Sequence, residues 1–407
     1  MNSTTTANNN VRVMQSGGPT PVMNRSLLGI VREASEREGY GAIYGARHGL
    51  DGVLSDTLTD LTKQSKTAWE RIGRTPGAAL GSSRRRLKDE DVPDALDVLS
   101  KRGIAYLFVI GGNDSAETGH RLSVASRDAG YELAVIAVPK TIDNDLVETD
   151  HTPGYGSAAR FVALATMGAG RDAEAMGRES PITLIEVMGR DTGWLAASAA
   201  LARRDERDAP HVICLPEVPV DEDRFLQLME EALGRYGFAV AVVAENARGV
   251  DGVLGGRQEP WYVDDFGHPY YDGPARYLAG MVGNRLGVRA RYEKPGTIQR
   301  SMMACVSAAD AGEAEMVGRA AVRYAAEGHR DEMVTLVRGP DSQGTSPGRP
   351  DKRYSCTTGL APLQRVAGGV KTMPDSYLDP SSYFVTREFE SYARPLIGGP
   401  LPRYERV

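Results

Sequence analysis

The stretch Leu133-Ala-Val-Ile-Ala-Val138, continued by Pro139-Lys-Thr-Ile-Asp-Asn-Asp145, determines the fold class that we predict for this chain. The first six residues are all apolar, which is typical of a strand buried on both faces of a parallel sheet. The polar residues that follow would then leave the carboxyl end of the strand, where α/β proteins bind their ligands. They offer two carboxylates, a hydroxyl and an ammonium, which can hold a metal ion, accept a proton and neutralise a phosphate oxygen. Taken alone, the segment is also compatible with an ordinary turn.

Strand-like and helix-like runs alternate along most of the chain. Apolar runs at 11–14, 106–110, 182–187, 212–215 and 240–244 are interleaved with helical patterns at 24–37, 116–127, 194–203 and 221–236. This alternation predicts βαβ units and parallel sheets. The 407 residues exceed what one hydrophobic core usually supports, so two α/β domains are expected.

Composition excludes several classes of protein. A hydrophobic content of 41% and a charged content of 25% are those of an ordinary soluble protein, and the net charge of −6 does not indicate a nucleic-acid or membrane partner. Three cysteines without a C-x-x-C pair argue against a disulfide scaffold or a zinc site. The first ten residues are polar, unlike a signal peptide, and no apolar run approaches the length of a membrane span. We therefore expect a cytoplasmic protein.

Three glycine-containing corners follow predicted strands. They are Ser16-Gly17-Gly18, Gly111-Gly112-Asn113-Asp114-Ser115 and Glu186-Val-Met-Gly-Arg190. Glycines at such a corner let backbone N–H groups approach an anion, and the following helix adds its positive end. One such turn is weak support for a ligand site, but three of them together with residues 139–145 favour a phosphate or sugar-phosphate site.

Five motifs in this order resemble the phosphofructokinase family. They are S-G-G-x-x-P-x-x-N at 16–24, G-G-x-D-S at 111–115, P-K-T-I-D-N-D at 139–145, E-V-M-G-R at 186–190 and P-G-x-x-Q-R at 295–300. The resemblance runs from about Val11 to about Gly328, and Arg394-Pro-Leu-Ile-Gly398 is similar to the tail of the longer, pyrophosphate-using members. It implies two Rossmann-like parallel-sheet domains with the active site in the cleft between them. It also implies phosphoryl transfer to the 1-hydroxyl of fructose 6-phosphate, Mg²⁺ as cofactor, and a homodimer or homotetramer.

The resemblance assigns a role to each residue that matches a motif. Asp143 is the expected general base, and Thr141 is expected to hold the transferring phosphoryl group. The residues assigned to substrate binding are Gly17, Arg84, Asp145, Met188, Gly189, Arg190, Glu245, Arg291 and Arg300. Those assigned to the metal are Asp143, Asp145 and Asn113. Some arginines that hold the 6-phosphate in this family come from a neighbouring subunit.

The choice of phosphoryl donor is predicted from Asp114 and Lys140. ATP-using members of the family have glycine at both positions. An aspartate at the first position adds bulk and negative charge, which disfavours a third phosphate, and the lysine supplies positive charge to a smaller donor. Both residues therefore favour pyrophosphate, and the alternatives left open are an ATP-dependent 6-phosphofructokinase, a different sugar-phosphate acceptor such as sedoheptulose 7-phosphate, and a non-catalytic regulatory subunit.

Three positions depart from the family pattern. Asn113 stands where many members have an aspartate near Mg²⁺, and an amide is a poorer ligand for this cation than a carboxylate. Thr297 replaces a histidine that assists sugar-phosphate binding, and Pro181 replaces an arginine, for which Arg178 is a candidate to compensate. Basic residues of the bacterial effector site are not recognisable in the first helix, so we expect no strong allosteric regulation.

The expected domain organisation has four parts. Residues 1–10 form a disordered tail, and residues 11–150, joined by part of 299–345, form the domain that binds the phosphoryl donor. Residues 151–298 form the fructose 6-phosphate domain, and residues 346–407 form a C-terminal extension. Segments 250–274 and 338–352 are rich in Gly, Pro and Asp and are expected to be surface loops.

Overall fold

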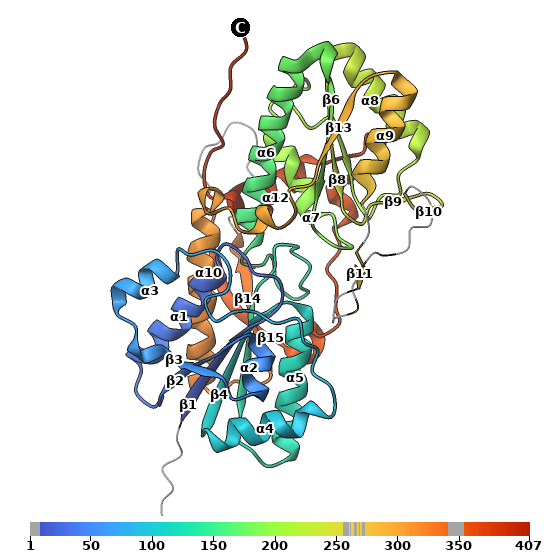
Figure 1. Cartoon of the computed structure of the whole chain (residues 1–407). Coiled ribbons are helices and arrows are strands. Elements are labelled where there is room, and N and C mark those ends of the chain that lie inside the picture. Colours follow the sequence, from blue (N-terminus) through green and yellow to red (C-terminus); the bar gives the residue numbers. More distant parts are fainter. Residues whose placement is uncertain are drawn as a thin grey trace, which may run out of the picture.

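A computed structural model of the chain describes residues 9–254, 260, 262–263, 267, 269–270, 273–340 and 354–407. Two separate sheets organise it, one at the bottom and one at the top of Figure 1. Each sheet is covered by helices on both faces. The prediction of an α/β protein with two domains built on parallel sheets is thereby confirmed.

The larger sheet has seven strands in the order β15-β14-β5-β4-β1-β2-β3. Its strands are β1 (Asn10–Gln15), β2 (Ile43–Ala46), β3 (Leu58–Asp60), β4 (Ile104–Gly111), β5 (Ala134–Pro139), β14 (Glu332–Arg338) and β15 (Cys356–Pro362). The five inner strands run parallel, and the edge strands β3 and β15 are antiparallel to their neighbours. Because parallel neighbours end at the same edge, β1, β4 and β5 bring their following loops together.

Alternate side chains of this sheet pack against helices on opposite faces. Phe108 and Ile110 of β4 pack with α1 (Met23–Glu36) and α10 (Ala308–Ala326), whereas Leu107 and Val109 face the other layer. That layer consists of α2 (Gly49–Leu54), α4 (Asp91–Lys101), α5 (Asn113–Asp128) and α11 (Leu363–Val366). The helix α3 (Lys66–Ile72) adds Trp69 to the face of α1. A strand covered on both faces needs the continuously apolar sequence from which it was predicted.

The smaller sheet has four parallel strands in the order β13-β6-β8-β7. Its strands are β6 (Ile182–Val187), β7 (Val212–Cys214), β8 (Ala239–Ala244) and β13 (Ala290–Glu293). The helices α6 (Tyr155–Met176), α7 (Trp194–Ala197) and α12 (Arg387–Ala393) cover one face, and α8 (Glu222–Tyr236) and α9 (Pro274–Leu286) cover the other. The carboxyl ends of β6 and β8 lie side by side, which places residues 188–190 next to residue 245.

One predicted helix differs in detail from the structure. The pattern at 194–203 predicts a single helix, whereas the chain forms α7 and then tightens into the 3₁₀ helix η3 (Ser198–Ala202). Side chains three residues apart eclipse one another in a 3₁₀ helix, and the small residues Ser198, Ala199 and Ala202 tolerate that crowding.

The C-terminal residues contribute to both domains. Strand β15 pairs with β14 in the larger sheet. Further on, Phe389 of α12 and Leu396 and Ile397 of the 3₁₀ helix η8 (Arg394–Ile397) enter the apolar core beside α6. The short strands β16 (Leu378–Asp379) and β17 (Phe384–Val385) pair with each other between these two regions. The domain limits given above remain a proposal.

The remaining elements are short. They are η1 (Leu61–Lys63), η2 (Gly177–Glu179), η4 (Gly296–Arg300), η5 (Met303–Cys305), η7 (Asp375–Tyr377) and the strands β9 (Arg248–Gly249), β10 (Gly252–Val253), β11 (Tyr262–Val263) and β12 (Pro269–Tyr270). Much of the predicted loops 250–274 and 338–352, and residues 1–8 of the predicted tail, lies outside the described residues, although Asn10 belongs to β1. Within the described ranges, no helix combines the length and apolarity needed to cross a bilayer.

Candidate active site

Three loops of the larger sheet meet at its carboxyl edge. Gly17 and Gly18 follow β1, Asn113 and Asp114 begin α5 directly after β4, and Lys140 follows β5. These strands are adjacent in the sheet, in the order β5-β4-β1. The three polar corners that the sequence predicts are therefore neighbours in space.

Lys140 lies against the glycine turn. Its ammonium nitrogen donates a hydrogen bond to the carbonyl oxygen of Gly18 at 2.8 Å, and only 4% of the residue is exposed. A Cβ atom at Gly17, where φ is +75°, would lie 3.1 Å from that nitrogen, and a side chain at Gly18 would collide with the guanidinium of Arg300. Gly17 suits this place because its φ is positive and the Lys140 nitrogen lies close, and Gly18 leaves room for the guanidinium of Arg300.

The cations of this region repel one another. Burial first, and then the charges of Arg300 and Arg190, lower the pKa of Lys140 to about 7. Asp143 and Asp145 act in the opposite direction but do not compensate. An anion bound beside Lys140 would raise this pKa again and so favour the ammonium form, because an opposite charge favours the charged state.

Two carboxylates and an amide lie at the centre of the cluster. Asn113 Nδ2 donates to Asp145 Oδ2 at 3.4 Å, and burial and then the charge of Asp143 raise the pKa of Asp145 to about 6. Asp143 Oδ1 and Asn113 Oδ1 are buried, and neither atom accepts a hydrogen bond from any part of the chain that the structure describes. Unpaired buried oxygens are costly, and oxygen is the ligand atom that hard divalent cations prefer. These residues therefore fit a divalent cation.

The loop that carries the carboxylates is itself well ordered by hydrogen bonds. The backbone N–H of Asp143 donates to Thr141 Oγ1 at 3.0 Å, and the carbonyl oxygen of Thr141 accepts from Thr152 Oγ1 at 2.9 Å. Asp143 and Asp145 are both less than 9% exposed. The side chains are thus positioned before any ligand arrives.

The smaller sheet supplies a second set of residues. Glu245, directly after β8, accepts hydrogen bonds from the backbone N–H groups of Gly189 and Arg190, at 3.2 and 3.0 Å. Met188 N donates to Gln299 Oε1 at 3.2 Å, so η4 is held against the end of β6. Gly189 (φ +143°) and Arg190 (φ +52°) both have positive φ, a strained conformation for arginine that is common at functional sites.

The two sets of residues come into contact through Asp143. Arg190 Nε lies 3.7 Å from Asp143 Oδ2, and Thr192 Oγ1, which donates to the carbonyl oxygen of Gly189 at 3.1 Å, lies 3.4 Å from the carbonyl oxygen of Asp143. Burial lowers the pKa of Arg190, but nearby carboxylates, Asp143 foremost, outweigh burial and raise it. The charges of Asp114 and Arg84 also act on this pKa, so both lie within electrostatic reach of Arg190.

Arg84 reaches the site through the loop after residue 80. The N–H of Gly17 donates to the carbonyl oxygen of Ser83 at 3.0 Å, and Ser82 Oγ donates to the carbonyl oxygen of Gly17 at 2.5 Å. The loop that carries Arg84 is therefore attached to the glycine turn.

Arg291 is not part of this cluster. It pairs in register with Thr183 at the amino end of β6, whereas Met188 follows the carboxyl end of that strand. At a rise of about 3.3 Å per residue, the distance from Thr183 to Met188 along the strand is about 16 Å. Arg291 forms an ion pair with Asp172 on α6 instead. Arg178 and Pro181 also precede β6, at this same end.

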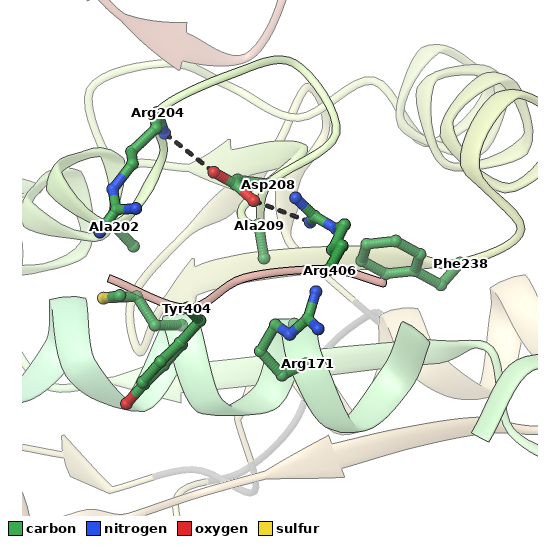
Figure 2. Close-up of a pocket in the computed structure, with 10 residues that line it drawn as sticks. Arg171, Ala202, Arg204, Asp208, Ala209, Phe238, Tyr404 and Arg406 are labelled. Carbon is green, nitrogen blue, oxygen red and sulfur yellow. Dashed lines mark hydrogen bonds and ion pairs between the residues drawn. The ribbon is translucent and has the colours of Figure 1, made fainter. Parts of the chain in front are cut away.

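A separate cavity lies between α6 and the turn at 202–209 (Figure 2). Its basic side chains are paired: Arg406 with Asp208 at 2.7 Å, and Arg171 with Glu174 at 2.6 Å. Arg204 donates to the carbonyl oxygen of Pro402 at 2.5 Å. None of the residues that line it belongs to the cluster around Asp143. With its charges paired internally, the cavity is not the candidate active site.

The chain is similar to known proteins along most of its length. A sequence profile described as phosphofructokinase matches residues 10–325. This chain belongs to the phosphofructokinase family. It is 37% identical over 403 residues to a pyrophosphate–fructose 6-phosphate 1-phosphotransferase of Rhodospirillum rubrum, covering 98% of this chain and 96% of the relative. It is also 31% identical to an ATP-dependent 6-phosphofructokinase of Streptomyces coelicolor, covering 91% and 98%.

Solved structures of this family have the same fold. A pyrophosphate-dependent phosphofructokinase from Nitrosospira multiformis superposes with a TM-score of 0.86 at 33% identity, covering 98% of this chain and 94% of that one. The resemblance stated from the five motifs is thereby confirmed.

Sequence reasoning missed several residues that position the site. Gln299 stands in the P-G-x-x-Q-R motif but received no role of its own, and Thr192, two residues after Arg190, was missed. Asn144 stands in the P-K-T-I-D-N-D motif but also received no role, and its partners Lys371 and Tyr392 were missed. Lys371 and Tyr392 follow Asn144 by 227 and 248 residues, so no local pattern could have associated them with it.

Proposed function

We propose that this phosphofructokinase transfers a phosphoryl group from pyrophosphate to the 1-hydroxyl of fructose 6-phosphate, giving fructose 1,6-bisphosphate and phosphate, and that the reaction is reversible. The observation that carries the proposal is the buried Lys140 ammonium on the glycine turn. Lys140 places a cation at a position where the ATP-using members of the family have glycine. Similarity to the enzyme of Rhodospirillum rubrum along nearly the whole chain supports the same donor.

Asp143 is the proposed general base. Its carboxylate accepts the proton of the 1-hydroxyl, the sugar oxygen attacks phosphorus, and the P–O bond to the leaving phosphate breaks. Its Oδ1 atom accepts no hydrogen bond from the described residues, which leaves an oxygen of this carboxylate available to the incoming groups. Thr141 and Lys140 are assigned to the oxygens of the transferring phosphoryl group, and Gly17 supplies a backbone N–H to the donor.

The second set of residues is assigned to the sugar. Met188, Gly189 and Arg190 line the place of the fructose ring, and Glu245 accepts from its hydroxyls. Burial and then the charge of Asp143 raise the pKa of Glu245, so hydrogen bonds from sugar hydroxyls would favour its charged form. Arg300 is assigned to the 6-phosphate, for which its planar fork suits paired hydrogen bonds.

Arg291 is assigned to a different subunit's site. It lies about 16 Å along the sheet from Met188, which is too far for a 6-phosphate bound beside its own Arg190. A homodimer or homotetramer in which Arg291 reaches a neighbouring site accounts for that position. A cytoplasmic location belongs to the same proposal.

Mg²⁺ is the proposed cation, held by Asp143, Asp145 and, more weakly, Asn113. When bound it neutralises charge on the phosphoryl oxygens. Asn113 Oδ1 is buried without a hydrogen-bond partner among the described residues, which is consistent with a ligand role for the amide.

The first experiment is a coupled assay on the purified protein with fructose 6-phosphate and Mg²⁺, comparing pyrophosphate with ATP. Turnover with pyrophosphate is expected, and turnover with ATP alone would overturn the donor assignment. The double variant Asp114→Gly with Lys140→Gly should then lose about 10²-fold in kcat/KM for pyrophosphate and gain use of ATP.

The matched control is Lys88→Gly, which removes an exposed lysine from the same domain. It should leave both donors within about two-fold of the unaltered protein. Full pyrophosphate activity in the double variant would show that these two positions do not choose the donor.

A further inference from the structure

The residue between the two catalytic carboxylates has an unusual conformation. Asn144 has φ of +58°, in the left-handed region, and is fully buried. Asparagine enters this region more easily than most residues, but the conformation persists only where the surroundings enforce it. What holds Asn144 also sets the directions of the flanking Asp143 and Asp145.

The side chain of Asn144 is held by three hydrogen bonds. Nδ2 donates to the hydroxyl of Tyr392 at 2.9 Å. Oδ1 accepts from the backbone N–H of Thr152 at 3.1 Å and from the ammonium of Lys371 at 3.4 Å. Two of these partners belong to the C-terminal part of the chain, outside the five motifs.

Lys371 attaches the loop at several further points. Its backbone N–H donates to the carbonyl oxygen of Asp145 at 2.7 Å. Its ammonium donates to the carbonyl oxygens of Thr149 and Asp150, at 3.1 and 2.9 Å. The same ammonium lies 5.1 Å from the ring centroid of Trp194. One side chain thus contacts both ends of the segment 144–150 and the helix that follows Thr192.

Tyr392 completes the attachment. Its hydroxyl donates to the carbonyl oxygen of Asp150 at 2.8 Å while accepting from Asn144. The guanidinium of Arg338 lies 4.7 Å from its ring centroid and forms an ion pair with the Asp150 carboxylate at 3.0 Å. The hydroxyl of Tyr392 bonds to both Asn144 and Asp150, so removing it breaks both hydrogen bonds and leaves the packing of the ring in place.

We infer that Lys371 and Tyr392 are positioning residues for phosphoryl transfer, which fix Asn144 in its left-handed conformation and so aim Asp143 and Asp145 at the reacting groups. The inference rests on the proposed function, since Asp143 must be the base. The C-terminal segment then acts in catalysis without touching either substrate. Loss of its contacts slows the chemical step and leaves substrate binding nearly unchanged.

The test compares Tyr392→Phe with Tyr377→Phe. Tyr377 belongs to the same aromatic group, with its ring centroid 5.6 Å from that of Tyr392. Because misplacement by about 1 Å can cost about 10²-fold in rate, Tyr392→Phe should lower kcat at least about ten-fold. The KM values for fructose 6-phosphate and pyrophosphate should stay within about two-fold, and Tyr377→Phe should match the unaltered protein in all three constants.

A second pair of variants tests Lys371. Lys371→Met keeps the aliphatic stem and removes the ammonium, and should lower kcat by about 10²-fold. Lys371→Arg retains a cation that can donate to the same carbonyl oxygens, and should recover part of the loss. All rates are measured well below the melting temperature of each variant, so that loss of folded protein does not enter.

An unchanged kcat in Tyr392→Phe and Lys371→Met would overturn the inference and leave the segment a purely stabilising role. A rise in KM at constant kcat would overturn it as well. Rates are compared with whichever donor the unaltered protein uses. Failure of the pyrophosphate assignment is therefore seen in the unaltered protein, and failure of the positioning role is seen only in the variants.

Discussion

Two clusters of charged side chains in this molecule differ in how their charges are paired. In the cluster around Asp143, a carboxylate oxygen has no hydrogen-bond partner among the described residues. Burial lowers the pKa of Lys140 and raises that of Asp145, and both shifts favour the neutral form of the side chain. In the cluster that borders the cavity of Figure 2, Arg406 bonds to both Glu174 and Asp208. Hydrogen bonds there outweigh burial and lower the pKa of Asp208.

The difference separates a site arranged for ligands from one arranged for stability. Groups that are charged, buried and incompletely paired are costly to the folded protein, and under the proposed function the substrates and the cation supply their partners. Groups that pair with one another leave little for a ligand to satisfy. Substitutions should therefore have opposite consequences in the two clusters: loss of activity without loss of stability in the first, and the reverse in the second.

The largest effect is expected for Asp143→Asn. Loss of a general base typically lowers the rate by about 10²- to 10⁴-fold, and we expect kcat to fall by about 10³-fold. Stability should be retained or increased, because the substitution removes a charge that raises the pKa of both Asp145 and Glu245. Steady-state kinetics and the melting temperature, measured on the same preparation, check both expectations.

Arg190→Gln is the comparison variant for that prediction. It removes the cation 3.7 Å from Asp143 but keeps the base, so the fall in kcat should be smaller. An unchanged kcat in Asp143→Asn would show that another group accepts the proton.

The second effect concerns the pH dependence of stability through Asp145. Its pKa is about 6 in the folded chain against a model-peptide value of 3.8, so the folded state resists its ionisation. Ionisation of Asp145 therefore lowers the free energy of unfolding. This destabilisation is absent below pH about 4, grows as the pH rises toward 6, and is fully present above pH 6. Asp145→Asn removes that cost, and the free energy of unfolding should increase by about 3 kcal/mol at pH 7.

Chemical denaturation with EDTA and without substrates, at pH 3.5 and pH 7, measures this difference. The asparagine can still accept the hydrogen bond from Asn113. Equal gains at both pH values would mean that the substitution acts through packing rather than through the carboxylate charge.

Much of this arrangement could be predicted from the sequence because the strands are apolar on both faces. The predicted run at 182–187 coincides with β6, and those at 106–110 and 240–244 end within one residue of β4 and β8. Each apolar run stops where the strand leaves the core, so the polar residues that follow are candidate site residues. Helix α6 was not predicted, because it is buried along much of its length and its alanines and glycines give little amphipathic contrast.

Two features required the three-dimensional structure. The place of Arg291 depends on the register of β13 against β6, which sets it at the amino end of the sheet, and a motif does not record register. The contacts of Lys371 and Tyr392 with Asn144 join residues more than 200 positions apart. Such contacts come from the packing of the C-terminal segment, which has no periodic pattern of its own.

The smallest effect is expected for Arg406→Met, in the paired cluster. Partly exposed ion pairs contribute about 1 kcal/mol or less, and the Arg406 side chain is 24% exposed, so the free energy of unfolding should fall by about 1 kcal/mol with kcat unchanged. The pKa of Asp208 is lowered in the folded chain, because hydrogen bonds, first that of Arg406, outweigh its burial. The stabilisation by the Arg406–Asp208 pair is therefore present above the pKa that Asp208 has in the unfolded chain. It is lost as the pH falls through the pKa of the folded chain, which is the opposite of the Asp145 effect. Arg403→Met, at an exposed position in the same segment, is the control and should change neither quantity. A loss of kcat in Arg406→Met without loss of stability would contradict the distinction between the two clusters, because it would assign a catalytic part to the one whose charges are already paired.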